Sequence, residues 1–201
     1  MDPADALKLL IKGNETFMAG KPARPNQSSR RRREVAGGQT PFAIVVGCSD
    51  SRIPPEMVFD RGLGDLFVVR TAGNVLDDAV LGSIEYAVLH LSVRLIVVLG
   101  HTSCGAVRAA MDDHPDPGHI PHLVEAIRPA VEKARRMAGD LYLNAVKANT
   151  AGIVHGLRNA PPVLANIARK GTLKVIGAIY HLDSGKVVFD ILPCDWKKAK
   201  R

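Results

Sequence analysis

The sequence predicts an α/β fold: a mostly parallel four-stranded sheet, with an added antiparallel strand at its edge and helices on its flanks. Short continuous apolar runs rich in Val and Ile recur along the chain, helical patterns separate them, and a tight turn joins the last two runs. Runs with apolar residues at successive positions are typical of strands covered on both faces. Their alternation with helices favours parallel pairing.

Four apolar runs predict the parallel strands: 42–46 (FAIVV), 66–70 (LFVVR), 95–100 (LIVVLG) and 173–182 (LKVIGAIYHL). The turn DSG at 183–185 predicts that 186–192 returns antiparallel beside the fourth strand. Helical patterns after the first strand occupy 76–91, 104–111, 121–139, 142–159 and 161–171. Pro129 lies inside the third of these segments, where a proline is expected to break or kink the helix.

Length and composition predict one domain over residues 1–201, since 201 residues suffice for a single hydrophobic core. We divide it into an N-terminal helical arm (about 4–20), a basic loop (about 21–40), an α/β core (about 41–192) and a basic tail (193–201). Three cysteines do not form a disulfide framework, and no apolar run is long enough to span a bilayer. The expected location is the cytoplasm, without a membrane partner.

The net charge is +7, and much of it lies in RRRR (30–33) and KKAKR (197–201). Basic runs can bind nucleic acid, but no aromatic residues interleave these two as stacking platforms would require. We therefore interpret them as a solvated loop and a solvated tail, and expect no nucleic-acid partner.

Three metal-ligand residues follow two of the predicted strands. Cys48 comes directly after the first strand, and His101 and Cys104 follow the third in GHTSCGAV. Ligands of open parallel sheets bind beyond the carboxyl ends of the strands, so these side chains meet if the two strands are neighbours. Two thiolates and an imidazole suit zinc. They leave one tetrahedral position, which a catalytic zinc keeps for water.

Asp50 and Arg52 stand beside Cys48 and give two alternatives. Asp50 could bind the metal as a fourth ligand and close the site. It could instead pair with Arg52 and orient the nucleophile by accepting its hydrogen bond. A purely structural zinc with four protein ligands, Asp50 included, also stays open.

At this point the chain resembles the β-class carbonic anhydrases. The resemblance lies in the signatures CSDSR (48–52) and HTSC (101–104), and in the segments GLGDLFVVRTAGN (62–74) and AVLGSIEYAVLHLSVRLIVVLGH (79–101). It extends from about Ala4 to Leu192 and implies the β-carbonic anhydrase fold.

The resemblance implies reversible hydration of carbon dioxide to bicarbonate and a proton, by attack of a zinc-bound hydroxide. It implies one Zn²⁺ per chain held by Cys48, His101 and Cys104, with Asp50 as a ligand only in a closed state. Asp50 and Arg52 match the catalytic dyad of the family. The positions matching its substrate cleft are Gln39, Phe67, Tyr86 and Gly105.

Phe67 and Tyr86 come from the partner subunit in the family, which implies a homodimer that can pair into a tetramer. Bicarbonate supply for carboxylating enzymes and pH balance are both compatible roles. A regulated subgroup holds an inhibitory bicarbonate with a tryptophan and an arginine. Arg70 matches that arginine, but Val45 stands at the tryptophan position and the chain's only tryptophan is Trp196. We therefore do not expect inhibition of that kind.

Alternatives remain for the activity and for other residues. Carbonyl sulfide or carbon disulfide hydrolysis uses the same scaffold, and a zinc-stabilised binding module would use 30–33 to hold an acidic partner. Three histidines in 114–122 could form a second metal site, but the segment offers no carboxylate or thiol at a known ligand spacing, so a solvated loop is expected. Cys194 belongs to no motif and is expected to be inert.

Overall fold

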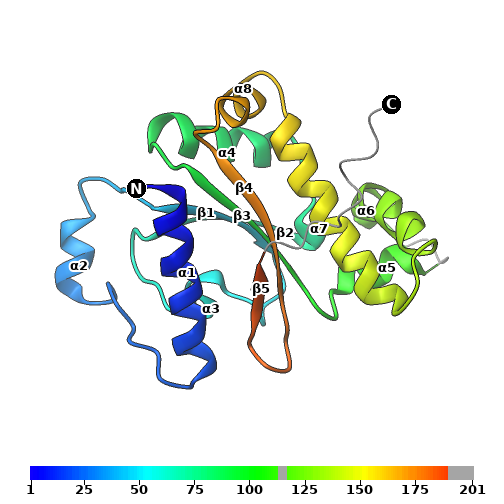
Figure 1. The fold of residues 1–201 in the computed structure, drawn as a ribbon, viewed down its shortest axis with the longest axis horizontal. Helices are drawn as coiled ribbons and strands as arrows, with labels where there is room; N and C mark the ends of the chain where they lie inside the picture. Colours follow the sequence, from blue (N-terminus) through cyan, green and yellow to red (C-terminus); the bar gives the residue numbers. More distant parts are fainter. Residues whose placement is uncertain (113–116, 190–201) are drawn as a thin grey trace.

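The computed structural model describes residues 1–112 and 117–189, and it confirms the predicted α/β class (Figure 1). The elements in chain order are α1 (Pro3–Met18), α2 (Ser29–Glu34), β1 (Ala43–Cys48), α3 (Pro55–Val58), β2 (Leu66–Thr71), η1 (Ala72–Asn74), α4 (Asp78–His90), β3 (Leu95–His101), α5 (Gly105–Met111), α6 (Ile120–Ala134), α7 (Leu141–Asn159), α8 (Val163–Arg169), β4 (Lys174–Tyr180) and β5 (Val187–Phe189).

The sheet has five strands in the order β2-β1-β3-β4-β5. The first four are parallel, and β5 pairs antiparallel with β4 at one edge. β1 lies between β2 and β3, so the first and third strands along the chain are neighbours, as the metal-site prediction requires. Strand β2 forms the other edge.

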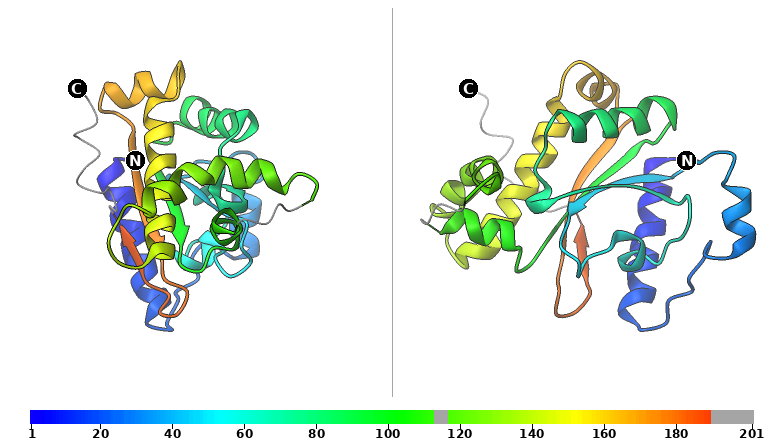
Figure 2. Two further views of the ribbon diagram at one scale, coloured as in Figure 1. Left: turned by 90° about the vertical axis from the view of Figure 1, so that its right-hand side faces the viewer. Right: turned by 180° about the vertical axis from the view of Figure 1, so that it is seen from behind.

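Helices cover both faces of the sheet, which explains the continuous apolar runs. In β1, Ala43 and Val45 belong to one core cluster, and Ile44 and Val46 belong to the other. The first cluster packs under α1, α3, α5 and α6, and the second under α4, α8 and the C-terminal half of α7. Figure 2 shows α1 and α4 on opposite sides of the sheet.

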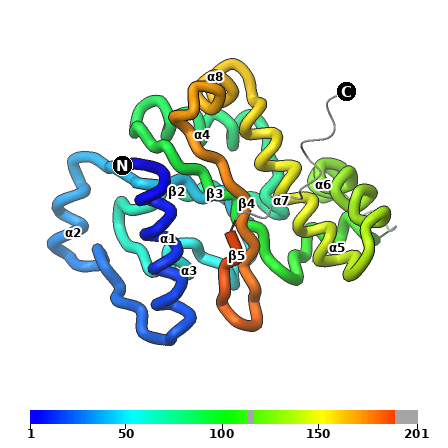
Figure 3. Tube along the Cα trace, viewed as in Figure 1, coloured from blue at the N-terminus to red at the C-terminus, as the bar shows by residue number. Residues whose placement is uncertain are grey.

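Helix α1 is anchored to the core of its own chain. Ala6 and Leu10 are fully buried, and the buried Asn14 side chain donates to the carbonyl oxygens of Val58 and Gly185. The chain trace places α1 and α2 at the opposite end of the molecule from α5 and α6 (Figure 3). The basic run 30–33 lies wholly within α2, so it is helical where a loop was predicted, and Arg31 donates to the carbonyl oxygen of Leu63.

Two further local features differ from the sequence prediction. Helix α6 continues through Pro129 without a break. The carbonyl of Glu125 loses its helical partner there, but Glu125 and Pro129 are both exposed, so water can satisfy that oxygen. The short helix α3 was not predicted. Within the described ranges, none of the helices has both the length and the apolar character that crossing a membrane demands.

Candidate metal centre

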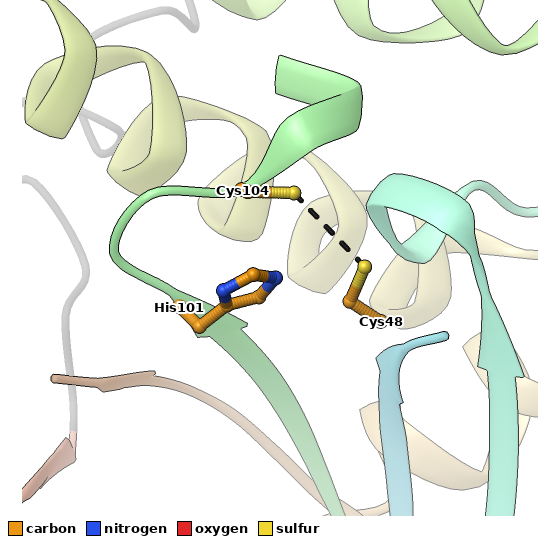
Figure 4. Close-up of side chains that lie close together, drawn as sticks. All are labelled: Cys48, His101 and Cys104. Atoms are coloured by element: carbon orange, nitrogen blue, oxygen red, sulfur yellow. Dashed lines mark hydrogen bonds between the residues drawn. The ribbon is translucent and has the colours of Figure 1, made fainter. Parts of the chain in front are cut away.

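Two loops at the carboxyl ends of β1 and β3 bring the predicted ligands together (Figure 4). Cys48 ends β1, His101 ends β3, and Cys104 immediately precedes α5. All three are buried, and their ligand atoms lie within 4.8 Å of one another. The two Sγ atoms are 4.0 Å apart. This convergence is the arrangement predicted for a metal site.

The donor set fits zinc. His101 Nδ1 lies 2.9 Å from the carbonyl oxygen of Thr102, whereas its buried Nε2 has no hydrogen-bond partner among the described residues. A backbone partner at one ring nitrogen directs the other toward a metal. A tetrahedral zinc with Zn–S bonds of 2.3 Å separates two sulfurs by about 3.8 Å, close to the distance found here. The orphaned Nε2 and the sulfur pair thus form three corners of a zinc site.

The two cysteines share one hydrogen bond, and neither forms a disulfide. That bond lowers the pKa of Cys48 and raises the pKa of Cys104, because a single proton between the sulfurs favours thiolate on one and thiol on the other. The backbone N–H of Gly73 also donates to Cys48 Sγ, at 3.3 Å. Cys48 is therefore prepared to bind a cation as thiolate.

Asp50 is held rigidly by Arg52 in the same loop. Arg52 Nε donates to Asp50 Oδ1 at 2.9 Å and Nη2 donates to Oδ2 at 2.7 Å, a bidentate pair. Mainly through these bonds, the pKa of Asp50 falls to about 2, so its carboxylate is ionised at neutral pH. Asp50 Oδ2 lies 3.9 Å from His101 Nε2. The carboxylate of Asp50 thus lies next to the candidate ligands while both of its oxygens accept hydrogen bonds from Arg52.

The side chain of Arg70, on β2, supports this loop by bonding to backbone carbonyl oxygens of the loop. Its Nε donates to the carbonyl oxygen of Cys48 at 2.8 Å and its Nη2 to that of Asp50 at 2.6 Å. The guanidinium is therefore bound to two peptide groups, and Val45, at the position of the subgroup's tryptophan, is buried in β1.

Sequence reasoning assigned no role to the segment AGN (72–74), which packs beneath Cys48. Gly73 has a left-handed backbone (φ +65°), and its carbonyl accepts a 2.9 Å bond from Asn149 Nδ2 on α7. The buried Asn74 side chain donates to the carbonyl oxygens of Val46 and Leu99, at 2.9 and 3.0 Å. It thereby joins the ends of β1 and β3, the two strands that lead to the candidate ligands. The signal was AGN, following directly after β2.

The second ligand loop is held by other side chains. Arg52 Nη2 donates to the carbonyl oxygen of Ser103 at 3.1 Å, and Tyr142 Oη donates to that of Cys104 at 2.6 Å. Burial raises the pKa of Tyr142, so its hydroxyl remains a donor at neutral pH. Tyr142 was also missed, because nothing in sequence links it to a loop 38 residues away.

The predicted cleft residues do not join the ligand cluster of this chain. Gln39 is exposed in the loop before β1. Phe67 on β2 and Tyr86 on α4 pair at the sheet edge, with ring centroids 6.5 Å apart. Gly105 begins α5 beside Cys104. Their roles as substrate contacts remain predictions.

The other candidates give no second metal cluster within 1–112 and 117–189, where Cys48, His101 and Cys104 form the only such group. Of the loop histidines, His119 and His122 are described. His114, Cys194, Trp196 and the tail 197–201 lie outside the described residues.

Comparison with known proteins decides the family. Residues 43–187 match the carbonic anhydrase family. "Carbonic anhydrase 2" of Mycobacterium tuberculosis is 44% identical over 191 residues, covering 93% of this chain and 92% of that protein. The carbonic anhydrase of Mycolicibacterium smegmatis is 45% identical, covering 92% of each. The chain belongs to the carbonic anhydrase family.

Solved structures specify the β class. A tetrameric β-carbonic anhydrase from Sordaria macrospora superposes with a TM-score of 0.72 at 25% identity, covering 92% of this chain and 96% of that one. The Coccomyxa β-carbonic anhydrase, in complex with acetazolamide, gives 0.72 at 28% identity, covering 93% and 85%. The chain is thus an enzyme for zinc-dependent, reversible hydration of carbon dioxide, and the cluster formed by Cys48, His101 and Cys104 is suited to the zinc.

Proposed function

We propose that Cys48, His101 and Cys104 bind the zinc and that Asp50 and Arg52 form the catalytic dyad. One observation carries this assignment: a carboxylate locked bidentately to an arginine lies 3.9 Å from the unpartnered nitrogen of the histidine ligand. Because Asp50 is committed to Arg52, we infer that the resting site is open, with the fourth position left for solvent.

Zinc bound by these residues supplies a hydroxide nucleophile near neutral pH, because it lowers the pKa of water to about 7. Residues of the chain orient this nucleophile. An ionised carboxylate is only an acceptor, so Asp50 Oδ2 holds the proton of the attacking oxygen and leaves a lone pair toward the substrate carbon. Arg52 keeps Asp50 ionised and away from the fourth coordination position.

The substrate cleft is completed by a second copy of the chain in this proposal. Gln39 and the backbone N–H of Gly105 donate to substrate oxygens, and the partner's Phe67 and Tyr86 form an apolar wall for an uncharged gas. The free chain supports such a contact: among the described residues no strand pairs with the outer edge of β2, and Tyr86 and Leu89 on α4 are 49% and 53% exposed. The tetrameric Sordaria structures support association of copies.

The location we propose is the cytoplasm, where Cys48 and Cys104, which form no disulfide, stay reduced. Bicarbonate supply or pH balance there would be served by the same reaction.

The experiment is stopped-flow carbon dioxide hydration between pH 6.5 and 9, with zinc content determined on the same samples. Asp50→Asn should keep about one zinc per chain. Its kcat/KM should fall by about 10²- to 10³-fold, a typical contribution to the rate of a residue that positions a proton. Carbonyl sulfide is assayed in parallel, and turnover of it at a higher kcat/KM would contradict the assigned substrate. Full hydration activity in Asp50→Asn would contradict the assignment of Asp50 and Arg52 as a catalytic dyad.

The shared cleft is tested by mixing two inactive variants. In a mixed dimer of Asp50→Asn and Tyr86→Ala, one of the two sites has a native Asp50 and faces a native Tyr86. Random pairing should therefore restore about a quarter of the wild-type activity, provided the cleft crosses a two-fold interface. Each variant alone is the control, and a mixture no more active than their average would mean that Tyr86 does not act across the interface.

A further inference from the structure

Tyr142 contacts the Cys104 loop from a helix that carries no metal ligand. It is the second residue of α7, whose start is fixed by Asp140 Oδ1 accepting the N–H of Leu143 at 2.6 Å. The Tyr142 ring is half-buried against the core cluster that contains both cysteines. From there its hydroxyl reaches the carbonyl oxygen of Cys104 at 2.6 Å.

The backbone that receives this bond needs external support. Ser103 has a left-handed conformation (φ +56°), which residues with a side chain adopt reluctantly. Cys104 occupies the N-cap position of α5 but makes no side-chain cap, and its Sγ lies near Cys48 and His101 instead. Its carbonyl oxygen accepts two donors, the N–H of Arg108 at 3.0 Å and the hydroxyl of Tyr142. The second donor ties this peptide to α7.

Arg108 adds a second link between the same two helices. It lies one turn after Cys104 in α5, and its Cζ is 4.4 Å from the centroid of the Tyr142 ring. A guanidinium over an aromatic face is attractive. Tyr142 therefore contacts the start of α5 twice. Its hydroxyl donates to the carbonyl oxygen of Cys104, and its ring packs against the guanidinium of Arg108.

We propose that Tyr142 is a positioning residue for the metal centre: its hydroxyl fixes the Cys104 peptide, so that Sγ stays directed toward the ion shared with Cys48 and His101. This rests on the proposed role of Cys104 as a zinc ligand. Groups that orient ligands from outside the coordination sphere affect metal affinity by about 10- to 100-fold. A hydroxyl that acts on a ligand's backbone is expected at the lower end of that range.

The test is Tyr142→Phe, which keeps the ring beneath Arg108 and removes only the hydroxyl. Zinc affinity is measured by competition with the chelator 4-(2-pyridylazo)resorcinol and should fall by about tenfold. The Co²⁺-substituted variant should show altered d–d and thiolate-to-cobalt charge-transfer bands, because the geometry at Sγ changes. Circular dichroism and thermal unfolding verify that the variant is folded.

Two controls make the result decisive. Tyr180→Phe removes the hydroxyl of Tyr180, a buried residue on β4, without affecting the Cys104 carbonyl, and should leave zinc affinity and the cobalt bands unchanged. Cys104→Ser should lose zinc outright, and retention of zinc there would overturn the ligand assignment together with this inference. If Cys104→Ser loses zinc but Tyr142→Phe matches the wild type, or weakens zinc no more than Tyr180→Phe, the role of Tyr142 alone is wrong.

Discussion

The two loops that carry the proposed zinc ligands are supported in different ways. The Cys48 loop rests on a close-packed neighbour: Gly73 donates to the sulfur itself, and Arg70 holds the carbonyls of Cys48 and Asp50. The Cys104 loop opens a short helix and is held at its carbonyls by Arg52 and Tyr142.

The difference shows most clearly in the space beside each loop. A Cβ on Gly73 would lie 2.5 Å from Ile127 Cδ1, whereas a Cβ on Gly105, next to Cys104, would have no heavy atom within 4 Å. The first loop combines steric fit at Gly73 with polar contacts, whereas the second is held by polar contacts beside open space. Both loops should therefore be sensitive to the loss of a donor, but only the first should be sensitive to added volume.

Removal of a sulfur should affect both loops alike and give the largest effect. Cys48→Ser and Cys104→Ser each take away one of the three proposed zinc ligands, so zinc should be lost on dialysis. Without zinc the nucleophile is ordinary water, with a pKa of about 15.7 instead of about 7, and kcat/KM should fall by at least about a thousandfold. Zinc content and stopped-flow hydration measure this. A Cys48→Ser enzyme with full zinc and activity would refute the site.

Gly73→Ala is the sharpest test of steric support under the first loop. The left-handed backbone and the close approach of Ile127 both oppose a methyl group, and together they should lower the free energy of unfolding by about 2–4 kcal/mol. Chemical denaturation of the metal-free protein measures the change. Wild-type stability would mean that the segment after β2 can move away from Cys48, and the contrast between the loops would fail.

Arg70→Lys should have a smaller effect, because lysine keeps the charge but cannot bond two carbonyls with a planar fork. We expect a loss of zinc affinity and kcat/KM of about tenfold, the scale of other groups that orient metal ligands. Zinc affinity is measured by chelator competition for Arg70→Lys and Tyr142→Phe in parallel. The two values compare how strongly each loop depends on its supporting side chain. An unchanged zinc affinity in Arg70→Lys would show that the packing of Gly73 alone holds the first loop.

The sequence predicted the convergence of the three candidate ligands better than it predicted their supports, for a physical reason. Cys48, His101 and Cys104 follow apolar runs that read as buried strands, and parallel strands place such ends at one edge of the sheet. Residue type and strand position were therefore sufficient. Asp50 and Arg52 were also visible, because a charged pair two residues apart can bond locally.

The supports depend on tertiary register, which local patterns do not contain. Asn74 matters because β1 and β3 end side by side, so that one amide reaches both strands. Tyr142 reads as an ordinary amphipathic helix residue until α7 is placed against α5. Pro129 was expected to break or kink α6, and whether its lost hydrogen bond is costly depends on solvent access at Glu125.

The smallest expected effect is that of Gly105→Ala, the counterpart of Gly73→Ala on the second loop. Gly105 is the first residue of α5, its backbone is not left-handed, and the added methyl group would enter open space. Alanine also favours the helical conformation over glycine. Stability and zinc affinity should therefore stay within about 0.5 kcal/mol of the wild type, as measured by denaturation and chelator competition. A loss as large as that of Gly73→Ala would mean that both loops are sterically specified, and the distinction drawn between them would be wrong.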